Sequence, residues 1–179
     1  NTAVKRGLIQ DSLTRGAITT ALTFDGWQCY EELKRGHSES RSAFMAMPFG
    51  VPSVVEMVDG TFREAVAETG FRLKRVDEEP KAGVIVNRMK VEIQTSRFLI
   101  ADLTDRNPGA YWEAGYAEGL GKPVIYTCEK TFFDQKKTHF DTNSSQTVIW
   151  DLNDTTKAAE DLKATIRATL PFEAKMPEE

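Results

Sequence analysis

The chain has 179 residues, of which 40% are hydrophobic and 28% are charged, and its formal net charge is −4. This composition is that of a globular protein with one ordinary core, and the mild charge, without runs of one sign, gives the main domain no basic surface for nucleic acid. No apolar stretch is longer than a strand, no signal-peptide pattern is present, and Cys29 and Cys128 form no close-spaced metal pair. We therefore expect a cytoplasmic protein without a membrane segment, a metal or a cofactor.

Residues 1–41 differ from the rest of the chain and are predicted to form a small α+β appendage. The expected elements are a helix over 3–13, a strand over 17–24, a helix over 25–36 with Asp25 as N-cap, and a polar linker over 37–42. Because the sequence begins at Asn1 and reads at once as mid-domain, we expect a piece of a longer protein. The appendage is similar to the tail of a winged-helix-type module, and only for that module is nucleic-acid binding left open.

From residue 42 to residue 179 the pattern alternates between strands and helices. Strands are expected at 43–49, 71–77, 97–104, 122–128 and 146–152, and helices at 53–70, 83–96, 109–120 and 155–170. This alternation predicts a five-stranded parallel sheet with helices on both faces, which is a flavodoxin- or Rossmann-like three-layer α/β sandwich.

Ligands of such sheets bind in the crevice at the carboxyl ends of the strands. The polar and exposed residues predicted at that edge are Phe49, Asp77, Asp102, Asn107, Glu113 and the segment 139–143.

Glu113 is the carboxylate of this set that stands out. On a helix over 109–120 it shares a face with Ala110 and Ala117, so it is expected to lie against the sheet. Burial would raise its pKa, while the amides of the first helical turn would favour its charged form. Asp102 ends a strand and is expected to point into the same crevice, as acid-base or nucleophilic chemistry at a glycosidic carbon requires. The alternatives are a helix-capping Glu113 and a turn-capping Asp102.

Three segments together carry a family resemblance: "FMAMPFG" (44–50), "RFLIADLTDRNPGAYWEAGYAEGLGKPVIYTC" (97–128) and "HFDTN" (139–143). They resemble the nucleoside 2-deoxyribosyltransferase-like superfamily, in a bacterial branch that appends the domain to a winged-helix or other sensor segment. That superfamily is related to Toll/interleukin-receptor (TIR) domains, whose enzymatic members cleave NAD with a glutamate. The resemblance implies that Glu113 is the nucleophile that attacks the anomeric carbon.

The same resemblance implies a substrate-binding loop and a substrate set. The loop against base and sugar would be Met47, Pro48, Phe49 and Gly50. The further substrate-binding residues expected are Asp77, Asn107, Gly109, Trp112, Asp141 and Asn143. Transferases of the family complete their pockets across a subunit interface, so a homodimer is expected, with aromatic residues of the Glu113 helix at the contact.

Two positions depart from the family pattern. Classical transferases have aspartates where this chain has Asn87 and Asn107. Neither amide can donate a proton as a carboxylic acid does, so protonation of the base would come from Asp102, from water, or not occur. The leading hypothesis is an N-glycosidic bond-cleaving hydrolase or transferase acting on a nucleoside, nucleotide or NAD-like substrate. The alternative is a non-catalytic nucleotide sensor that signals to the N-terminal module.

Overall fold

The computed structural model describes residues 7, 9–14, 17–27, 40–76, 85–136 and 147–177. The chain divides into two units, Asn1–His37 and Ser38–Glu179, which are treated separately below. None of the helices in these described stretches has the length and apolar character needed to cross a membrane.

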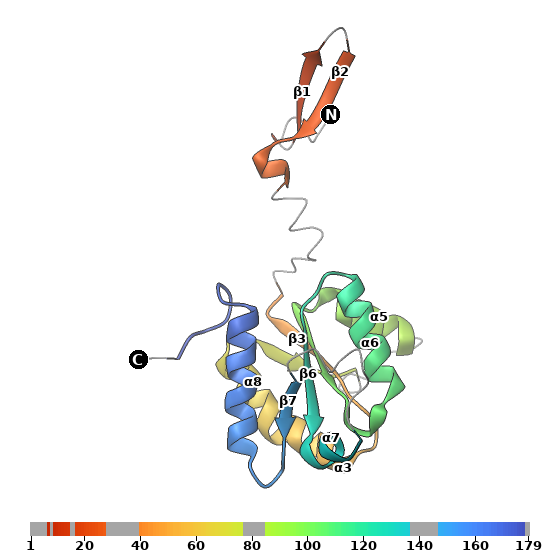
Figure 1. Ribbon diagram of the computed structural model, residues 1–179, viewed down its shortest axis with the longest axis vertical. Coiled ribbons are helices and arrows are strands. Elements are labelled where there is room, and N and C mark those ends of the chain that lie inside the picture. Colours follow the sequence, from red (N-terminus) through yellow and green to blue (C-terminus); the bar gives the residue numbers. More distant parts are fainter. Residues whose placement is uncertain are drawn as a thin grey trace. The chain divides into compact units, whose positions relative to one another are not determined.

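The N-terminal unit contains an antiparallel hairpin of β1 (Ile9–Thr14) and β2 (Ala17–Leu22), with Ile9 opposite Leu22 (Figure 1). The expected strand over 17–24 is confirmed, but the expected helix over 3–13 is wrong from residue 9 onward. Only two residues separate the strands in sequence, a spacing typical of hairpins, and pairing with the β-branched residues of β2 outweighs the weak helical pattern of the first segment.

A short helix follows the hairpin at residues 24–27. Its N-cap is Thr23 rather than the expected Asp25, because Thr23 Oγ1 accepts a hydrogen bond of 3.0 Å from the Gly26 amide. Residues 28–36 of the predicted helix lie outside the described residues.

The larger unit is built on a five-stranded parallel sheet, which confirms the predicted fold class. The strand order is β4-β3-β5-β6-β7. The strands are β3 (Ser42–Ala46), β4 (Arg72–Lys74), β5 (Phe98–Asp102), β6 (Val124–Glu129) and β7 (Thr147–Trp150). Every residue of β3 and β5 is buried, because both strands lie inside the sheet and are covered on both faces.

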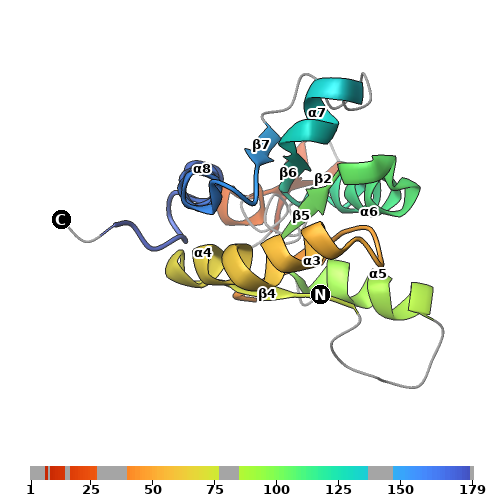
Figure 2. The same cartoon turned by 90° about the horizontal axis from the view of Figure 1, so that it is seen from below.

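Helices cover both faces of this sheet and form the outer layers of a three-layer sandwich (Figures 1 and 2). One face carries α3 (Pro52–Met57), a π-helical turn η1 (Val58–Phe62), α4 (Arg63–Glu68) and α8 (Thr155–Thr169). The other carries α5 (Ile85–Thr95), α6 (Pro108–Gly119) and α7 (Lys130–Lys136), with a 3-10 turn η2 (Thr104–Arg106) before α6. Figure 2 shows α4 beside α8 on the first face.

Two helical regions differ from the sequence expectation. The helix expected over 53–70 is interrupted by η1, where the Arg63 amide donates to the Val58 carbonyl five residues earlier. The segment after β6, for which no helix was expected, forms α7, because Phe132 and Phe133 pack against the apolar cluster on that face.

Candidate active site

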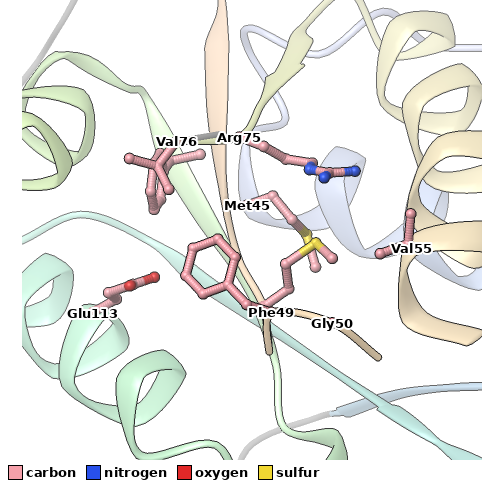
Figure 3. Close-up of a pocket in the computed structure, with 9 residues that line it drawn as sticks. Met45, Phe49, Gly50, Val55, Arg75, Val76 and Glu113 are labelled. Carbon is pink, nitrogen blue, oxygen red and sulfur yellow. The ribbon is translucent and has the colours of Figure 1, made fainter. Parts of the chain in front are cut away.

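A pocket lies at the carboxyl ends of β3 and β4, where the sequence places the crevice (Figure 3). It is a partly open hollow, and the space of about 360 Å³ within it includes space that belongs to the open solvent. Its lining residues are Phe44, Met45, Met47, Phe49, Gly50, Val55, Arg75, Val76 and Glu113. The two strands that come after β3 in the sequence are its neighbours in the sheet, β4 on one side and β5 on the other. The pocket is therefore at the topological switch point of the sheet, the usual ligand position in such folds.

Helix α6 brings Glu113 to this pocket. Asn107 caps the helix, since its Oδ1 accepts a 3.0 Å hydrogen bond from the Gly109 amide, and Pro108 occupies the first helical position. The buried face of α6 contains Ala110, Glu113, Ala114 and Ala117, as the spacing predicts. Only 8% of Glu113 is exposed.

The charge state of Glu113 is governed by burial. Helix α6 begins at Pro108, one residue earlier than expected, and no acidic residue lies in its first turn. Glu113 therefore lies in the second turn, away from the N-terminal amides. Burial raises the pKa of Glu113 to about 7. A carboxyl group with such a pKa is poised between its charged and neutral forms at neutral pH, a property more frequent in active sites than elsewhere.

This pKa makes stability depend on pH. The folded-state pKa of about 7 is above the reference value of 4.5, so the folded protein binds the proton more tightly, and this stabilisation is lost as pH rises from about 4.5 through 7. Relative to Glu113→Gln, which does not titrate, the wild type is expected to lose up to about 3 kcal/mol of unfolding free energy between pH 5 and pH 8. Urea unfolding of both proteins across this range measures the difference, and parallel pH profiles would contradict a raised pKa.

Asp102, the second predicted catalytic carboxylate, is not among the residues lining the pocket. It is fully buried, and its Oδ2 accepts 2.7 Å hydrogen bonds from Thr127 Oγ1 and from Trp150 Nε1. Its Oδ1 accepts a 3.0 Å bond from the Thr104 amide. Burial raises the pKa of Asp102, and these hydrogen bonds oppose that shift. Asp102 thus ties β5 to β6 and β7.

The geometry of β5 explains why Asp102 and Glu113 do not meet. Side chains alternate along a strand, and Asp102 follows Phe98 and Ile100, which belong to the core on the α8 side. Helix α6, which carries Glu113, covers the opposite face. The two carboxylates therefore do not share one crevice, contrary to expectation. The alternation of side chains along "RFLIAD" already places Asp102 on the same face as Phe98 and Ile100.

The structure brings three residues of the predicted substrate-binding loop to the pocket. Met47, Phe49 and Gly50 line the pocket, whereas Pro48 is buried and does not. Phe49 is 66% exposed and lies over the pocket in Figure 3. Gly50 has φ +74°, a left-handed conformation that favours glycine.

The other predicted binding residues lie elsewhere or cannot be placed. Asn107 and Gly109 form the cap of α6 and do not line the pocket. Trp112 is 45% exposed and stacks on Tyr116, with ring centroids 5.4 Å apart. Asp77, Asp141 and Asn143 lie outside the described residues, and Asn87 is exposed on α5.

Sequence reasoning missed Arg75, the cation of the pocket lining. It comes directly after β4, and its Nη1 donates a 2.8 Å hydrogen bond to Asp59 Oδ2. The sequence signal is again alternation: Arg75 is two residues from buried Leu73, and so it faces the same layer as α3 and η1.

Solved structures show similar architecture. The chain resembles a 2-deoxyribosyltransferase from the psychrotolerant bacterium Bacillus psychrosaccharolyticus, with 15% sequence identity and a TM-score of 0.50, over 75% of this chain and 99% of that one. It also resembles a 2-desoxiribosyltransferase from Leishmania mexicana, with 22% identity and a TM-score of 0.42, over 49% of this chain and 63% of that one. No protein-family model and no curated protein sequence matches the chain.

At these identities the similarity establishes the fold. The larger unit is an α/β domain with a nucleoside 2-deoxyribosyltransferase-like fold. The kinship with TIR domains and the winged-helix character of the N-terminal segment stay predictions.

Proposed function

We propose that the protein cleaves the N-glycosidic bond of a nucleoside, a nucleotide or an NAD-like molecule, with Glu113 as the nucleophile. The observation that supports this most is the position of Glu113, a buried carboxylate with a pKa of about 7 in the pocket at the switch point of the fold. The similarity to deoxyribosyltransferase structures supports the same chemistry.

The proposed reaction has two steps. In the first, a Glu113 carboxylate oxygen bonds to C1′ while the C1′–N bond breaks, and its electron pair leaves with the base. Asp102 faces the other side of the sheet, so the departing base takes its proton from water. In the second step, water or an acceptor base attacks C1′, the ester bond breaks, and Glu113 regains its charge. Water as acceptor loses a proton and gives hydrolysis, and a second base gives transfer.

The proposed nucleophile must be ionised to react. Base release from a panel of nucleosides, nucleotides and NAD, followed by chromatography, is therefore expected to rise with pH and to level off above an apparent pKa near 7. Adding a second free base to the assay separates transfer, which yields a new nucleoside, from hydrolysis. A rate that falls as pH rises from 5 to 8 would contradict an ionised Glu113 nucleophile.

A second candidate function, a non-catalytic nucleotide sensor, is favoured by one specific observation. Among the described residues, Glu113 is the carboxylate that lines the pocket, and the family's aspartate positions hold Asn87 and Asn107. Nucleotide binding without base release from any member of the panel is the result expected of a sensor.

The homodimer also stays a prediction. It is supported by the stacked pair of Trp112 and Tyr116 on α6, where Trp112 is 45% exposed, since exposed aromatic side chains are enriched at interfaces.

A further inference from the structure

The turn between β5 and α6 has an uncommon backbone conformation. Asp105 has φ +60° and ψ +21°, and Arg106 has φ +49°. Residues with a Cβ rarely adopt such left-handed conformations, and arginine adopts them less readily than aspartate. No other non-glycine residue in the described stretches of the chain has a positive φ. A conformation of this kind persists only where the surrounding structure holds it, and it is frequent at functional sites.

Buried contacts hold the residues just before this turn. Leu103 is fully buried, and its amide donates a 2.9 Å hydrogen bond to the Thr127 carbonyl. Thr104 is also buried, and its Oγ1 accepts a 3.0 Å hydrogen bond from the Glu129 amide. The Thr104 amide donates to Asp102 Oδ1. Thr104 therefore fastens the start of the turn both to the end of β6 and to the hydrogen-bond network of Asp102.

The turn leads directly into the helix that carries Glu113. The Arg106 amide donates a 3.2 Å hydrogen bond to the Leu103 carbonyl, and Asn107 follows as the N-cap of α6. Glu113 is the sixth residue after this cap. Because the rise and the rotation per residue of an α-helix are fixed, the turn that places Asn107 also places Glu113.

The buried face of α6 gives the helix few other constraints. Besides Glu113, its buried side chains are those of Ala110, Ala114 and Ala117. Alanine has no atom beyond Cβ that could interlock with the sheet and fix the rotation of the helix about its axis. The bulkier side chains of α6 that pack against the apolar cluster on this face are only partly buried. We therefore expect the start of α6 to govern the direction of the Glu113 carboxylate, which points toward the pocket in Figure 3.

We propose that Thr104 is a positioning residue for Glu113. It holds the left-handed turn at Asp105 and Arg106, the turn sets the start of α6, and the helix directs the carboxylate at C1′ of the substrate. Thr104 does not line the pocket, so it acts through Glu113. The inference rests on the proposed function, because its catalytic consequence requires Glu113 to be the nucleophile. A displacement of about 1 Å can lower the rate of a positioned reaction roughly 100-fold.

Thr104→Val tests this role, because valine has nearly the same shape but cannot accept the hydrogen bond from the Glu129 amide. The kcat of base release, measured per folded protein, is expected to fall about 10- to 100-fold with KM nearly unchanged. The apparent pKa of the pH–rate profile should fall below about 7, because burial raises the pKa of Glu113 and a displaced helix exposes its carboxylate to water. Arg75, the other charged residue that lines the pocket, follows β4 and is not part of the turn.

Two further variants control for general effects of the substitution. Thr104→Ser keeps the hydroxyl and should keep the wild-type kcat and apparent pKa. Thr69→Val is the matched control for the loss of a buried hydroxyl. Thr69 is fully buried at the end of α4, on the other face of the sheet from α6, and its Oγ1 donates a 2.7 Å hydrogen bond to the Val66 carbonyl. Thr69→Val should lower stability but leave kcat and the apparent pKa unchanged.

A rescue experiment tests whether the turn is the link between Thr104 and Glu113. Arg106→Gly, added to Thr104→Val, is expected to restore most of the lost kcat, because glycine adopts a left-handed backbone readily and the turn then needs less support. Arg106→Ala removes the same side chain but keeps a Cβ, so it should restore nothing. Thr104→Ala replaces Thr104→Val in this comparison if the valine variant does not fold.

Wild-type kcat and apparent pKa in Thr104→Val, equal effects of Thr104→Val and Thr69→Val, or no rescue by Arg106→Gly would overturn the positioning role. If the wild type releases no base from any member of the panel, the proposed catalysis fails instead. The pKa of Glu113, taken from the pH dependence of unfolding relative to the Glu113→Gln protein, then still tests the turn. Thr104→Val should lower this pKa, and an unchanged value would overturn the inference about Thr104 alone.

Discussion

Glu113→Gln is expected to lower base release by roughly 10³- to 10⁶-fold, the range seen when a catalytic nucleophile is removed. The amide is nearly isosteric with the carboxyl group but is a poor nucleophile, so no covalent intermediate forms. The protein should remain folded, because at neutral pH the substitution removes a charge that burial disfavours. Single-turnover base release and circular dichroism measure the two effects.

Glu118→Gln is the matched control for this experiment. Glu118 lies on the same helix but is exposed, and its Oε1 accepts a 2.9 Å hydrogen bond from the Tyr126 hydroxyl that a glutamine oxygen can also accept. This variant should retain wild-type activity. Full activity of Glu113→Gln would remove Glu113 from the mechanism and leave the sensor as the better description.

Asp102→Ala is expected to lower the free energy of unfolding by about 3 to 5 kcal/mol, because three buried donors lose their acceptor and each unsatisfied group costs about 1 to 3 kcal/mol. The substitution leaves the Trp150 indole, the Thr127 hydroxyl and the Thr104 amide without their common acceptor. Asp102→Asn should cost less, because it retains one oxygen acceptor. Urea unfolding at pH 7 gives both values.

A double-mutant cycle separates this structural role from proton transfer. Trp150→Phe removes the indole donor, so combining it with Asp102→Asn should give less than the sum of the two losses. The contrary result is an Asp102→Asn protein with wild-type stability and a turnover that is about 10² to 10⁴ lower, which would restore Asp102 as a general acid.

The sequence was most informative where local rules decide the structure. Buried runs such as "FLIAD" predicted the central strands. Helical spacing predicted α6 over 109–120, within one residue of the observed Pro108–Gly119. Glu113 could be placed on the buried face from helical spacing alone.

The contacts of Asp102 and Arg75 were not predicted, because their hydrogen-bond partners are distant in the sequence. Asp102 is held by Trp150, which is 48 residues away, and Arg75 is held by Asp59, which is 16 residues away. No local sequence pattern predicts which residues form such hydrogen-bonded pairs. The N-terminal hairpin was missed for a related reason, because β1 is a strand only through its pairing with β2.

The π-helical turn η1 makes the construction of the pocket depend on the number of residues in this region. A π turn contains one more residue than an α-helical turn, and in an α-helix each residue advances the chain by about 100° around the axis. Deleting Gly60 would restore a regular helix and leave the sheet and its covering helices in place. The same deletion would rotate Asp59 relative to Arg63 and away from Arg75. Chains with this fold that differ by a single insertion or deletion here can thus differ in the position of Arg75, and so in the shape of the pocket, even where every residue that lines it is the same.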